Sequence, residues 1–286
     1  MNRIPIAAAA VLVGCLAGPL AAETIEQAAR AVEADLGGRV GVALRRHDDT
    51  ETHGYRMDER FPLSSTFKVP LCGAILALVD AGEERLDRVI AYGADDLVTY
   101  SPVTELHVDD GMSVAQLCHA TITQSDNSAG NLLLDRVGGP GGLTEYLRTI
   151  GDDTTRLDRW ETDLNEATPG DPRDSTTPAQ MIDTVEALVL GPVLSDPSRG
   201  QLEGWMQADA VADDLIRASL PDGWQIGDKT GAGGYGSRSI IAVIRPPQGD
   251  AWVASVYLTG NDADMATRNR AIARIGAAMV DTIGQP

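Results

Sequence analysis

The spacing of apolar residues predicts helices and strands in a definite order along the chain. Residues 24–36 and 263–282 carry apolar side chains at helical intervals, which is typical of amphipathic helices that cover a core. Strand-like runs lie close to both ends of the chain. The predicted strands span residues 39–44, 51–57, 224–228, 239–245 and 251–258.

The middle of the chain, from residue 65 to about residue 205, is mainly helical in pattern. Strands near both termini with helices between them indicate an antiparallel sheet built from both chain ends, with a helical part inserted. We therefore predict an α/β fold (an α+β sandwich) in a single domain over residues 23–286. Its α/β part covers 23–62 and 206–286, and its all-helical part covers 63–205.

The first 22 residues have the pattern of a signal peptide. Arg3 precedes an uncharged run over residues 4–16, and Ala21-Ala22 offers a cleavage site. The apolar run is too short to span a bilayer comfortably. We predict secretion to the periplasm without stable membrane association. Residues 12–15 also fit a lipoprotein processing site, so a lipid anchor on Cys15 is the alternative.

The chain is strongly acidic, and this limits its partners. The formal net charge is −19, and removal of the leader takes away Arg3 and no acidic residue, which makes it −20. Such a surface repels nucleic acid and anionic membranes. The four histidines form neither an H-x-H nor an H-E-x-x-H pattern. We therefore expect no nucleic acid partner and no catalytic zinc site.

Two cysteines, Cys72 and Cys118, remain after the leader. An even pair in an exported chain favours a disulfide. The bond would close a loop of about 47 residues, worth roughly 4 kcal/mol in the chain-entropy model. Two separate buried thiols are the alternative.

Four short polar fragments follow one another over more than half of the chain. Each is common alone. Together they supply a serine nucleophile, an amine, a hydroxyl for proton transfer, a carboxylate and a clamp for an anion, which predicts a serine acyl transferase acting on an anionic amide. The fragments are Ser65-Thr66-Phe67-Lys68, Ser125-Asp126-Asn127, Glu161-Thr162-Asp163-Leu164-Asn165 and Lys229-Thr230-Gly231.

Ser65 and Lys68 stand at the start of a long apolar run that predicts a central buried helix. Three residues apart, their side chains share one face of it, and the helix start offers backbone N–H groups to negative charge. Lys68 can act as a base only if burial or neighbouring positive charge lowers its pKa. The alternative is a capping serine and an ordinary surface lysine.

The second fragment forms a polar junction between two helical segments, 114–123 and 129–137. In the functional interpretation Ser125 passes a proton to the leaving nitrogen and Asn127 binds the substrate's side-chain amide, while Asp126 fixes the junction. The alternative is a simple helix cap, because all three residue types are good caps.

Residues 159–174 have neither a helical nor a strand period. We predict a compact loop of the Ω type whose neck is closed by an ion pair between Arg159 and Asp174. Inside it, Glu161 and Asn165 are spaced to meet on one side of a helical turn. There both could hold a water molecule, and Glu161 could take its proton. An ordinary solvent-exposed loop is the alternative.

The last fragment follows the predicted strand 224–228, and its small residues would let a substrate approach the strand edge closely. Lys229 supplies a fixed positive charge and Thr230 a hydroxyl. The N–H of Ala232 is a candidate second oxyanion donor beside that of Ser65. Arg238, on the next strand, could add a bidentate contact to an anion.

With these fragments in order, the sequence resembles the class A serine β-lactamases. The resemblance covers essentially the whole mature chain, and the paired Cys72 and Cys118 resemble the disulfide of one branch of that family. Ser64 and Gly233 stand where the carbapenem-hydrolysing branch has a cysteine pair, so carbapenemase activity is not expected. The further matches are Phe61-Pro62, Arg159-Trp160-Glu161, Asp228-Lys229-Thr230-Gly231-Ala232-Gly233, Gly236-Ser237-Arg238 and Arg268-Asn269-Arg270.

The resemblance implies hydrolysis of the β-lactam ring of penicillins and early cephalosporins through an acyl-enzyme on Ser65, giving antibiotic resistance. It gives Ser125 the proton transfer to the ring nitrogen, and Glu161 with Asn165 the activation of water. Whether Lys68 or Glu161 takes the serine proton stays open. The same resemblance places Tyr100 and Gly231 among the substrate-binding residues. It also implies a monomer with small-molecule substrates, no metal and no cofactor.

Two rival functions share part of this equipment. A D-alanyl-D-alanine peptidase would have the serine, the lysines and the Ser-x-Asn fragment, but it would lack a carboxylate placed like Glu161. A β-lactam sensor that stays acylated would normally carry membrane spans, and the mature sequence has no apolar run long enough for one.

Overall fold

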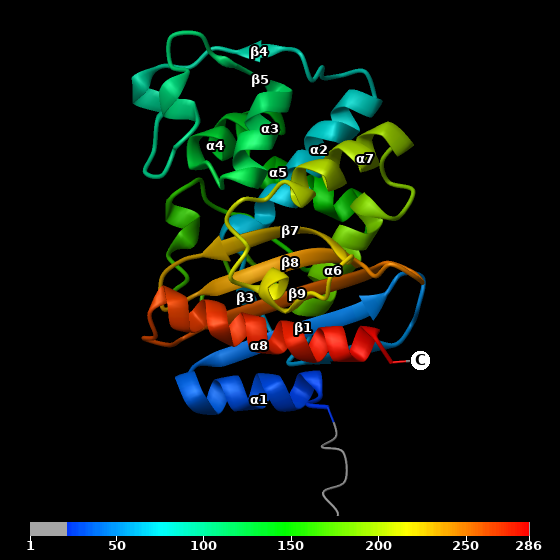
Figure 1. The fold of residues 1–286 in the computed structure, drawn as a ribbon. Coiled ribbons are helices and arrows are strands. Elements are labelled where there is room, and N and C mark those ends of the chain that lie inside the picture. Colours follow the sequence, from blue (N-terminus) through cyan, green and yellow to red (C-terminus); the bar gives the residue numbers. More distant parts are fainter. Residues whose placement is uncertain (1–21, 286) are drawn as a thin grey trace, which may run out of the picture.

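Both ends of the chain contribute to one five-stranded antiparallel sheet in the computed structural model, which describes residues 22–285 (Figure 1). The predicted signal peptide and Cys15 lie outside the described residues, apart from Ala22. The strand order is β2-β1-β9-β8-β7, which confirms the predicted sheet. Its strands are β1 (Arg39–Arg46), β2 (Thr52–Tyr55), β7 (Gln225–Ala232), β8 (Arg238–Arg245) and β9 (Trp252–Thr259).

Helices cover both faces of this sheet. The terminal helices α1 (Ile25–Leu36) and α8 (Met265–Ile283) lie side by side on one face, and α6 (Pro178–Val189) packs on the other (Figure 1). Strand side chains alternate between faces. In β8, accordingly, Ile240 belongs to the core under α1 and α8, whereas Ile241 belongs to the core shared with the helical part. A strand that is buried on both faces therefore has a continuous run of apolar residues in its sequence.

The helical part surrounds α2 (Lys68–Asp80). Every α2 residue from Lys68 to Leu76 is buried, as expected for a helix that is apolar all round. The 3-10 turn η1 (Ser64–Phe67) leads directly into α2. The surrounding helices are α3 (Val114–Thr123), α4 (Asn127–Arg136), α5 (Gly139–Thr149) and α7 (Asp196–Gln207).

Several short elements were not predicted, because two-residue strands and single 3-10 turns carry no periodicity. The pairing of β3 with β6 joins Phe61 to Thr176, so the base of the Ω loop is attached next to the segment that leads to Ser65. The short elements are β3 (Phe61–Pro62), β4 (Val89–Ile90), β5 (Met112–Ser113), β6 (Ser175–Thr176), η2 (Ala94–Asp96), η3 (Thr104–Leu106), η4 (Asp163–Asn165) and η5 (Ile216–Ser219).

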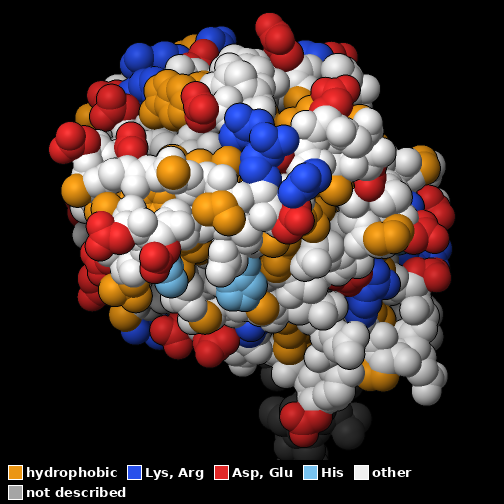
Figure 2. Space-filling model, turned by 90° about the horizontal axis from the view of Figure 1, so that it is seen from above, with side chains coloured by type: hydrophobic (Ala, Val, Ile, Leu, Met, Phe, Trp, Pro, Cys, Tyr) orange, Lys and Arg blue, Asp and Glu red, His pale blue; other side chains and the backbone are white. Residues whose placement is uncertain are grey.

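The surface carries many charged groups. In Figure 2 acidic side chains are spread around the outline of the face that is shown, and basic side chains lie among them. Within residues 22–285, every helix is too short or too polar to cross a membrane.

Candidate active site

A cleft of about 500 Å³ lies between β7 and the helical part; we call it the catalytic cleft. Most of its lining was predicted from the sequence. The lining residues that were predicted are Ser65, Tyr100, Ser125, Asn127, Asn165, Thr230, Gly231, Ala232 and Arg238, and those that were not assigned a role are Val211, Met265 and Asn269.

Ser65 lies in η1, just ahead of α2, and 7% of it is exposed. The prediction placed it in the first turn of the helix itself. The structure differs, because residues 64–67 form a 3-10 turn and α2 begins at Lys68. Thr66 stabilises the turn from its buried side, because its hydroxyl donates to the Leu63 carbonyl at 2.7 Å. As a result the nucleophile faces the cleft while its neighbours are buried.

The Lys68 ammonium is fully buried and surrounded by acceptors. Its Nζ donates to the Ser125 carbonyl at 2.9 Å and to Asn127 Oδ1 at 2.7 Å, and it lies 3.1 Å from Glu161 Oε1. Burial lowers the pKa of Lys68 below its usual value, and the Glu161 carboxylate opposes this shift. The alternative of a surface lysine is therefore wrong.

The Ser125-Asp126-Asn127 junction is held by its central residue. Asp126 is the N-cap of α4, and its Oδ1 accepts from the Ala129 N–H at 2.8 Å. Its Oδ2 accepts from the Thr104 N–H at 2.9 Å. Ser125 takes a positive φ of 58°, and it lines the catalytic cleft together with Asn127. The junction therefore combines the capping interpretation with the functional one.

The Asn127 amide is partly used by the protein itself. Besides accepting from Lys68, its Nδ2 donates to the Thr99 carbonyl at 2.9 Å. Its backbone N–H donates to the carbonyl of Tyr100 at 3.0 Å. Tyr100 has a φ of 67° and its side chain is half exposed at the cleft. Asn127 thus joins Lys68 to the segment that carries Tyr100.

The neck of the Ω loop, residues 159–174, has the predicted ion pair. Arg159 Nε lies 2.6 Å from Asp174 Oδ2, and the Asp174 carboxylate is almost completely buried. Asp174 Oδ1 also accepts from the backbone N–H groups of Asp158 and Arg159 at 2.7 and 3.0 Å. Arg159 contacts the exposed Glu166 as well. The loop is therefore closed by a charged, hydrogen-bonded cluster.

Glu161 is buried inside this loop and paired with Asn165 as predicted. Asn165 Nδ2 donates to Glu161 Oε2 at 2.5 Å. Glu161 Oε1 lies near the Lys68 ammonium, but the geometry is not that of a hydrogen bond, and this oxygen and Asn165 Oδ1 are buried acceptors without a protein donor. A water molecule that donates to both would satisfy them.

Asn131 is a positioning residue that sequence reasoning missed. Its Oδ1 accepts from the Glu161 N–H at 2.9 Å, and its Nδ2 donates to the Glu161 carbonyl at 3.0 Å. The available signal was its position four residues after Asn127, on the same face of α4. Similarly, Asn269 accepts from Arg238 Nε at 2.9 Å. Both asparagines orient the residues that face the cleft.

The Lys229-Thr230-Gly231 fragment lies within β7, not after its end as predicted. The ladder with β8 continues as far as Ala232, which pairs with Arg238. The polar fragment lacks the apolar pattern of a strand, and for this reason the predicted strand stopped too early. Lys229 is fully buried, and its Nζ donates to the Thr230 carbonyl at 3.0 Å.

Among the described residues, one group of side chains could hold a metal ion, and it lies away from the catalytic cleft. It consists of His47 and Asp48 in the β1–β2 turn and Glu186 of α6. Glu186 Oε1 already accepts from the Asp48 N–H at 3.1 Å and lies 2.8 Å from His47 Nδ1, and Arg45 binds its other oxygen. Both Glu186 oxygens therefore already have protein partners, and the group is an ion cluster of the protein's own side chains.

Known structures share this fold and much of this sequence. The ancestral class A β-lactamase GNCA is 53% identical with a TM-score of 0.89, over 91% of this chain and 100% of that chain. A class A β-lactamase of the last common ancestor of Gram-negative bacteria is 52% identical with the same TM-score, over 91% and 99%. A protein of Rhodopseudomonas palustris described as the class A β-lactamase PenP is 49% identical, over 90% and 99%, with a TM-score of 0.89.

The model of the Beta-lactamase enzyme family matches residues 23–283. The chain belongs to the class A serine β-lactamases. It is an enzyme that hydrolyses β-lactams and so supports resistance to these antibiotics. The predicted family and enzyme class are confirmed.

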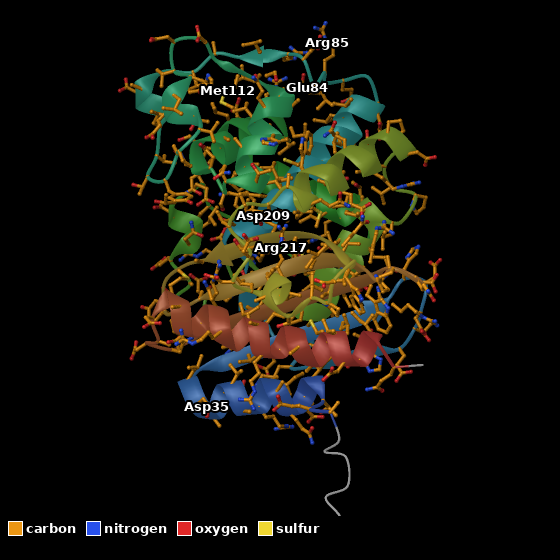
Figure 3. All side chains as sticks on the ribbon, viewed as in Figure 1. Asp35, Glu84, Arg85, Met112, Asp209 and Arg217 are labelled. Carbon is orange, nitrogen blue, oxygen red and sulfur yellow. The ribbon has the colours of Figure 1, made fainter. Side chains whose placement is uncertain are left out.

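The two lysines of this β-lactamase, Lys68 and Lys229, are the only lysines in its sequence, and both are fully buried at the site. Burial lowers the pKa of Lys229 to about 8, and the positive charges of Lys68 and Arg238 act in the same direction. Asp209 opposes the shift. Figure 3 shows Asp209 and Arg217 close to β7, and Arg217 Nε donates to Asp228 Oδ2 at 2.8 Å.

The charge of Lys229 predicts how substrate binding by the β-lactamase depends on pH. Lys229 is positively charged below a pH of about 8 and neutral above it, and β-lactam substrates carry a carboxylate. We expect kcat/KM for benzylpenicillin to fall as the pH rises through about 8, because kcat/KM follows the pKa values of the free enzyme. A rate profile from about pH 6 to about pH 10 checks this. A value that stays level up to about pH 10 contradicts it.

The two cysteines are free thiols in this structure of the β-lactamase, which differs from the predicted disulfide. Both are completely buried. Burial and the adjacent Cys118 thiol raise the pKa of Cys72. The side chains are thus neighbours between α2 and α3, as the prediction required, and the bond itself stays a prediction.

Proposed function

We propose that this β-lactamase is exported and hydrolyses penicillins and early cephalosporins in preference to oxyimino-cephalosporins and carbapenems. The observation that carries the hydrolytic part is the Glu161 carboxylate, which is buried between the Lys68 ammonium and the Asn165 amide. A peptidase or a sensor that keeps its acyl group has no need of a carboxylate held in this way.

In the proposed acylation step, Ser65 Oγ attacks the lactam carbonyl and the ring C–N bond breaks. The backbone N–H groups of Ser65 and Ala232 are the expected oxyanion donors. The serine proton passes to Lys68 or Glu161, and Ser125 delivers a proton to the ring nitrogen. Ser125 then recovers a proton from Lys68, so that one proton has moved in total from Ser65 to the ring nitrogen. Lys68 connects these groups, because it donates to the Ser125 carbonyl and lies beside Glu161.

In the proposed deacylation step, a water molecule bound by Glu161 and Asn165 attacks the ester carbon. The two unpaired buried acceptors, Glu161 Oε1 and Asn165 Oδ1, support this position for the water. Glu161 takes one proton of the water and the bond between the ester carbon and Ser65 Oγ breaks. The same proton then passes to Oγ, so Ser65 leaves as the free hydroxyl and the Glu161 carboxylate is restored. The substrate carboxylate would bind meanwhile to Lys229, Thr230 and Arg238. Arg238 is held for this contact by the Gly231 carbonyl at 3.0 Å and by Asn269.

The width of the site supports the proposed selectivity. The Gly234 N–H donates to the Asn165 carbonyl at 2.8 Å, so the end of β7 lies directly against the Ω loop. A Cβ atom on Gly233 would lie 2.8 Å from Asn165 O and 2.8 Å from Ser64 Oγ. Little room is left for a branched acyl side chain. With Ser64 and Gly233 in these positions, the disulfide of the carbapenem-hydrolysing branch cannot form.

The selectivity is tested with one purified preparation assayed against ampicillin, ceftazidime and imipenem. We expect kcat/KM for ampicillin to exceed the other two values by about 10²-fold or more, since the poor fit of a bulky group in a tight pocket accounts for ratios of this size. Comparable values for the three substrates would show that the proposed width of the site is wrong.

The export proposal makes a prediction about the cysteines. In an oxidising compartment Cys72 and Cys118 should join and tie α2 to α3, and reduction should then lower the melting temperature while hydrolysis stays measurable. Alkylation of the unreduced, denatured protein from the periplasm measures the free thiols. Two alkylated thiols per chain would contradict the disulfide, and protein alkylated after reduction is the control.

A further inference from the structure

A second cleft, of about 410 Å³, lies between the later part of the Ω loop and the end of the sheet where β1 begins and β9 ends. It shares no lining residue with the catalytic cleft. We infer that this second cleft binds small organic carboxylates with an aromatic body, and that its occupant acts on the hydrolysis of the acyl-enzyme. The second half of this inference rests on the proposed function; the first does not.

The walls of the second cleft are mainly apolar and are not closed by hydrogen bonds. Between residues 167 and 171 the described hydrogen bonds stay within the Ω loop; one example is the Asp171 N–H, which donates to the Thr168 carbonyl at 3.1 Å. The loop is tied to the body again at Pro172, whose carbonyl accepts from Ser175 Oγ. The apolar lining consists of Phe61, Pro62, Ala167, Pro169 and Pro172.

Arg60 gives the second cleft its preference for an anion. This exposed guanidinium donates to Ser175 Oγ at 3.0 Å and to the Thr154 carbonyl at 2.9 Å, both neutral groups. Within the described residues no carboxylate lies within 4.0 Å of it, although the protein is strongly acidic. Guanidinium groups bind carboxylates well because two N–H groups can face two oxygens.

The other charges of the second cleft are already neutralised. Arg39 lies 3.0 Å from Glu59, and its guanidinium stacks over the Phe61 ring at 4.6 Å. Asp171 lies 2.6 Å from Arg173. Among the described lining residues, Arg60 is therefore the charged group that has no oppositely charged partner within 4.0 Å. The volume of the cleft falls in the lower range of small-molecule sites. These features together fit a bicyclic aromatic carboxylate.

The position of the second cleft connects it to the part of the Ω loop that holds Glu161 and Asn165. Ala167, in its wall, is two residues from Asn165, whose carbonyl accepts from Gly234 at 2.8 Å. A ligand that fits the cleft as it stands favours the loop position in which Asn165 and Glu161 are paired. If the site is as narrow as proposed, a bulky acyl group can be hydrolysed only when the loop moves. Its hydrolysis should therefore become slower, and hydrolysis of a small penicilloyl group should not.

Binding is tested by calorimetric titration of the full chain with 1-naphthoate and with the neutral 1-naphthamide. We expect the carboxylate to bind at least fivefold more tightly than the amide, and Arg60→Gln to weaken its binding at least fivefold. Arg85→Gln is the matched control, because Arg85 is an exposed arginine at the far end of the helical part (Figure 3). Equal affinity for the two compounds in the unaltered protein would overturn the site, whatever the effect of the variants.

A carboxylate probe could also enter the catalytic cleft, where Lys229 and Arg238 lie. Inhibition of nitrocefin hydrolysis separates the two places. If 1-naphthoate binds without competing with nitrocefin, the result supports the second cleft. If 1-naphthoate inhibits nitrocefin hydrolysis strictly competitively, at the concentration that half-saturates the calorimetric signal, the result overturns it.

The coupling to hydrolysis is tested by turnover in saturating 1-naphthoate. We expect ceftazidime turnover to fall at least twofold and benzylpenicillin turnover to change by less than that. Unchanged turnover of both substrates would overturn the coupling. The calorimetric result stands separately from the proposed substrate selectivity, because no β-lactam is present in that titration.

Discussion

Glu161→Ala is expected to turn the enzyme into one that benzylpenicillin acylates but that releases its product very slowly. Glu161 holds the proposed water together with Asn165, whereas Ser65 and its oxyanion donors are untouched by the change. A general base contributes about 10² to 10⁴-fold to a rate, so we expect deacylation to slow by about that factor.

Intact-protein mass spectrometry measures this as a persistent adduct of the mass of the penicillin. Digestion of the adduct then shows whether it lies on the peptide that contains Ser65. Glu166→Ala is the matched control. Glu166 is a carboxylate in the same loop whose side chain is 52% exposed and paired with Arg159, and its removal should leave no adduct after turnover. Rapid hydrolysis by Glu161→Ala would show that another group activates the water.

Lys68→Ala is expected to affect the earlier step. Lys68 donates to the Ser125 carbonyl and to Asn127 Oδ1, and its ammonium lies 3.1 Å from Glu161 Oε1. Its loss therefore disconnects the groups that move the serine proton. We expect acylation by benzylpenicillin to slow by about 10² to 10⁴-fold, the range for a lost acid–base group. No adduct should accumulate, in contrast to Glu161→Ala.

Rapid-quench mass spectrometry of the two variants measures acylation alone. Circular dichroism spectra that match the unaltered protein are the control for folding. Acylation of Lys68→Ala at the unaltered rate would contradict the role of Lys68. Acylation that persists in Glu161→Ala and is lost in Lys68→Ala would identify Lys68 as the group that takes the serine proton.

Local sequence patterns predicted the parts of this fold that repeat with a period. The amphipathic helices α1 and α8 and the apolar strands β8 and β9 lie within a few residues of their predicted bounds. The Arg159–Asp174 pair could be predicted because both charges flank a segment without periodicity. In these cases the signal comes from neighbouring residues alone.

The remaining features depend on contacts between distant segments. The β3–β6 pair and the extension of β7 through Lys229 follow from backbone pairing, to which a two-residue or polar strand adds no pattern. The role of Asn131 depends on the packing of the Ω loop against α4, because its partner Glu161 is 30 residues away in sequence. The second cleft arises where residues 167–171 of the Ω loop make no hydrogen bonds to the described residues outside the loop. No residue type in the sequence predicts this absence.

The burial of both lysines has a consequence for the chemical labelling of this enzyme. Its exposed cations are arginines, so the described surface offers no lysine amine to an acylating reagent such as an N-hydroxysuccinimide ester. Of the two, Lys229 has a pKa of about 8 and is partly in its reactive neutral form near neutral pH. A lysine label on the folded protein therefore reports that a reagent has entered the site, and protection of that amine becomes a footprint of whatever occupies the catalytic cleft.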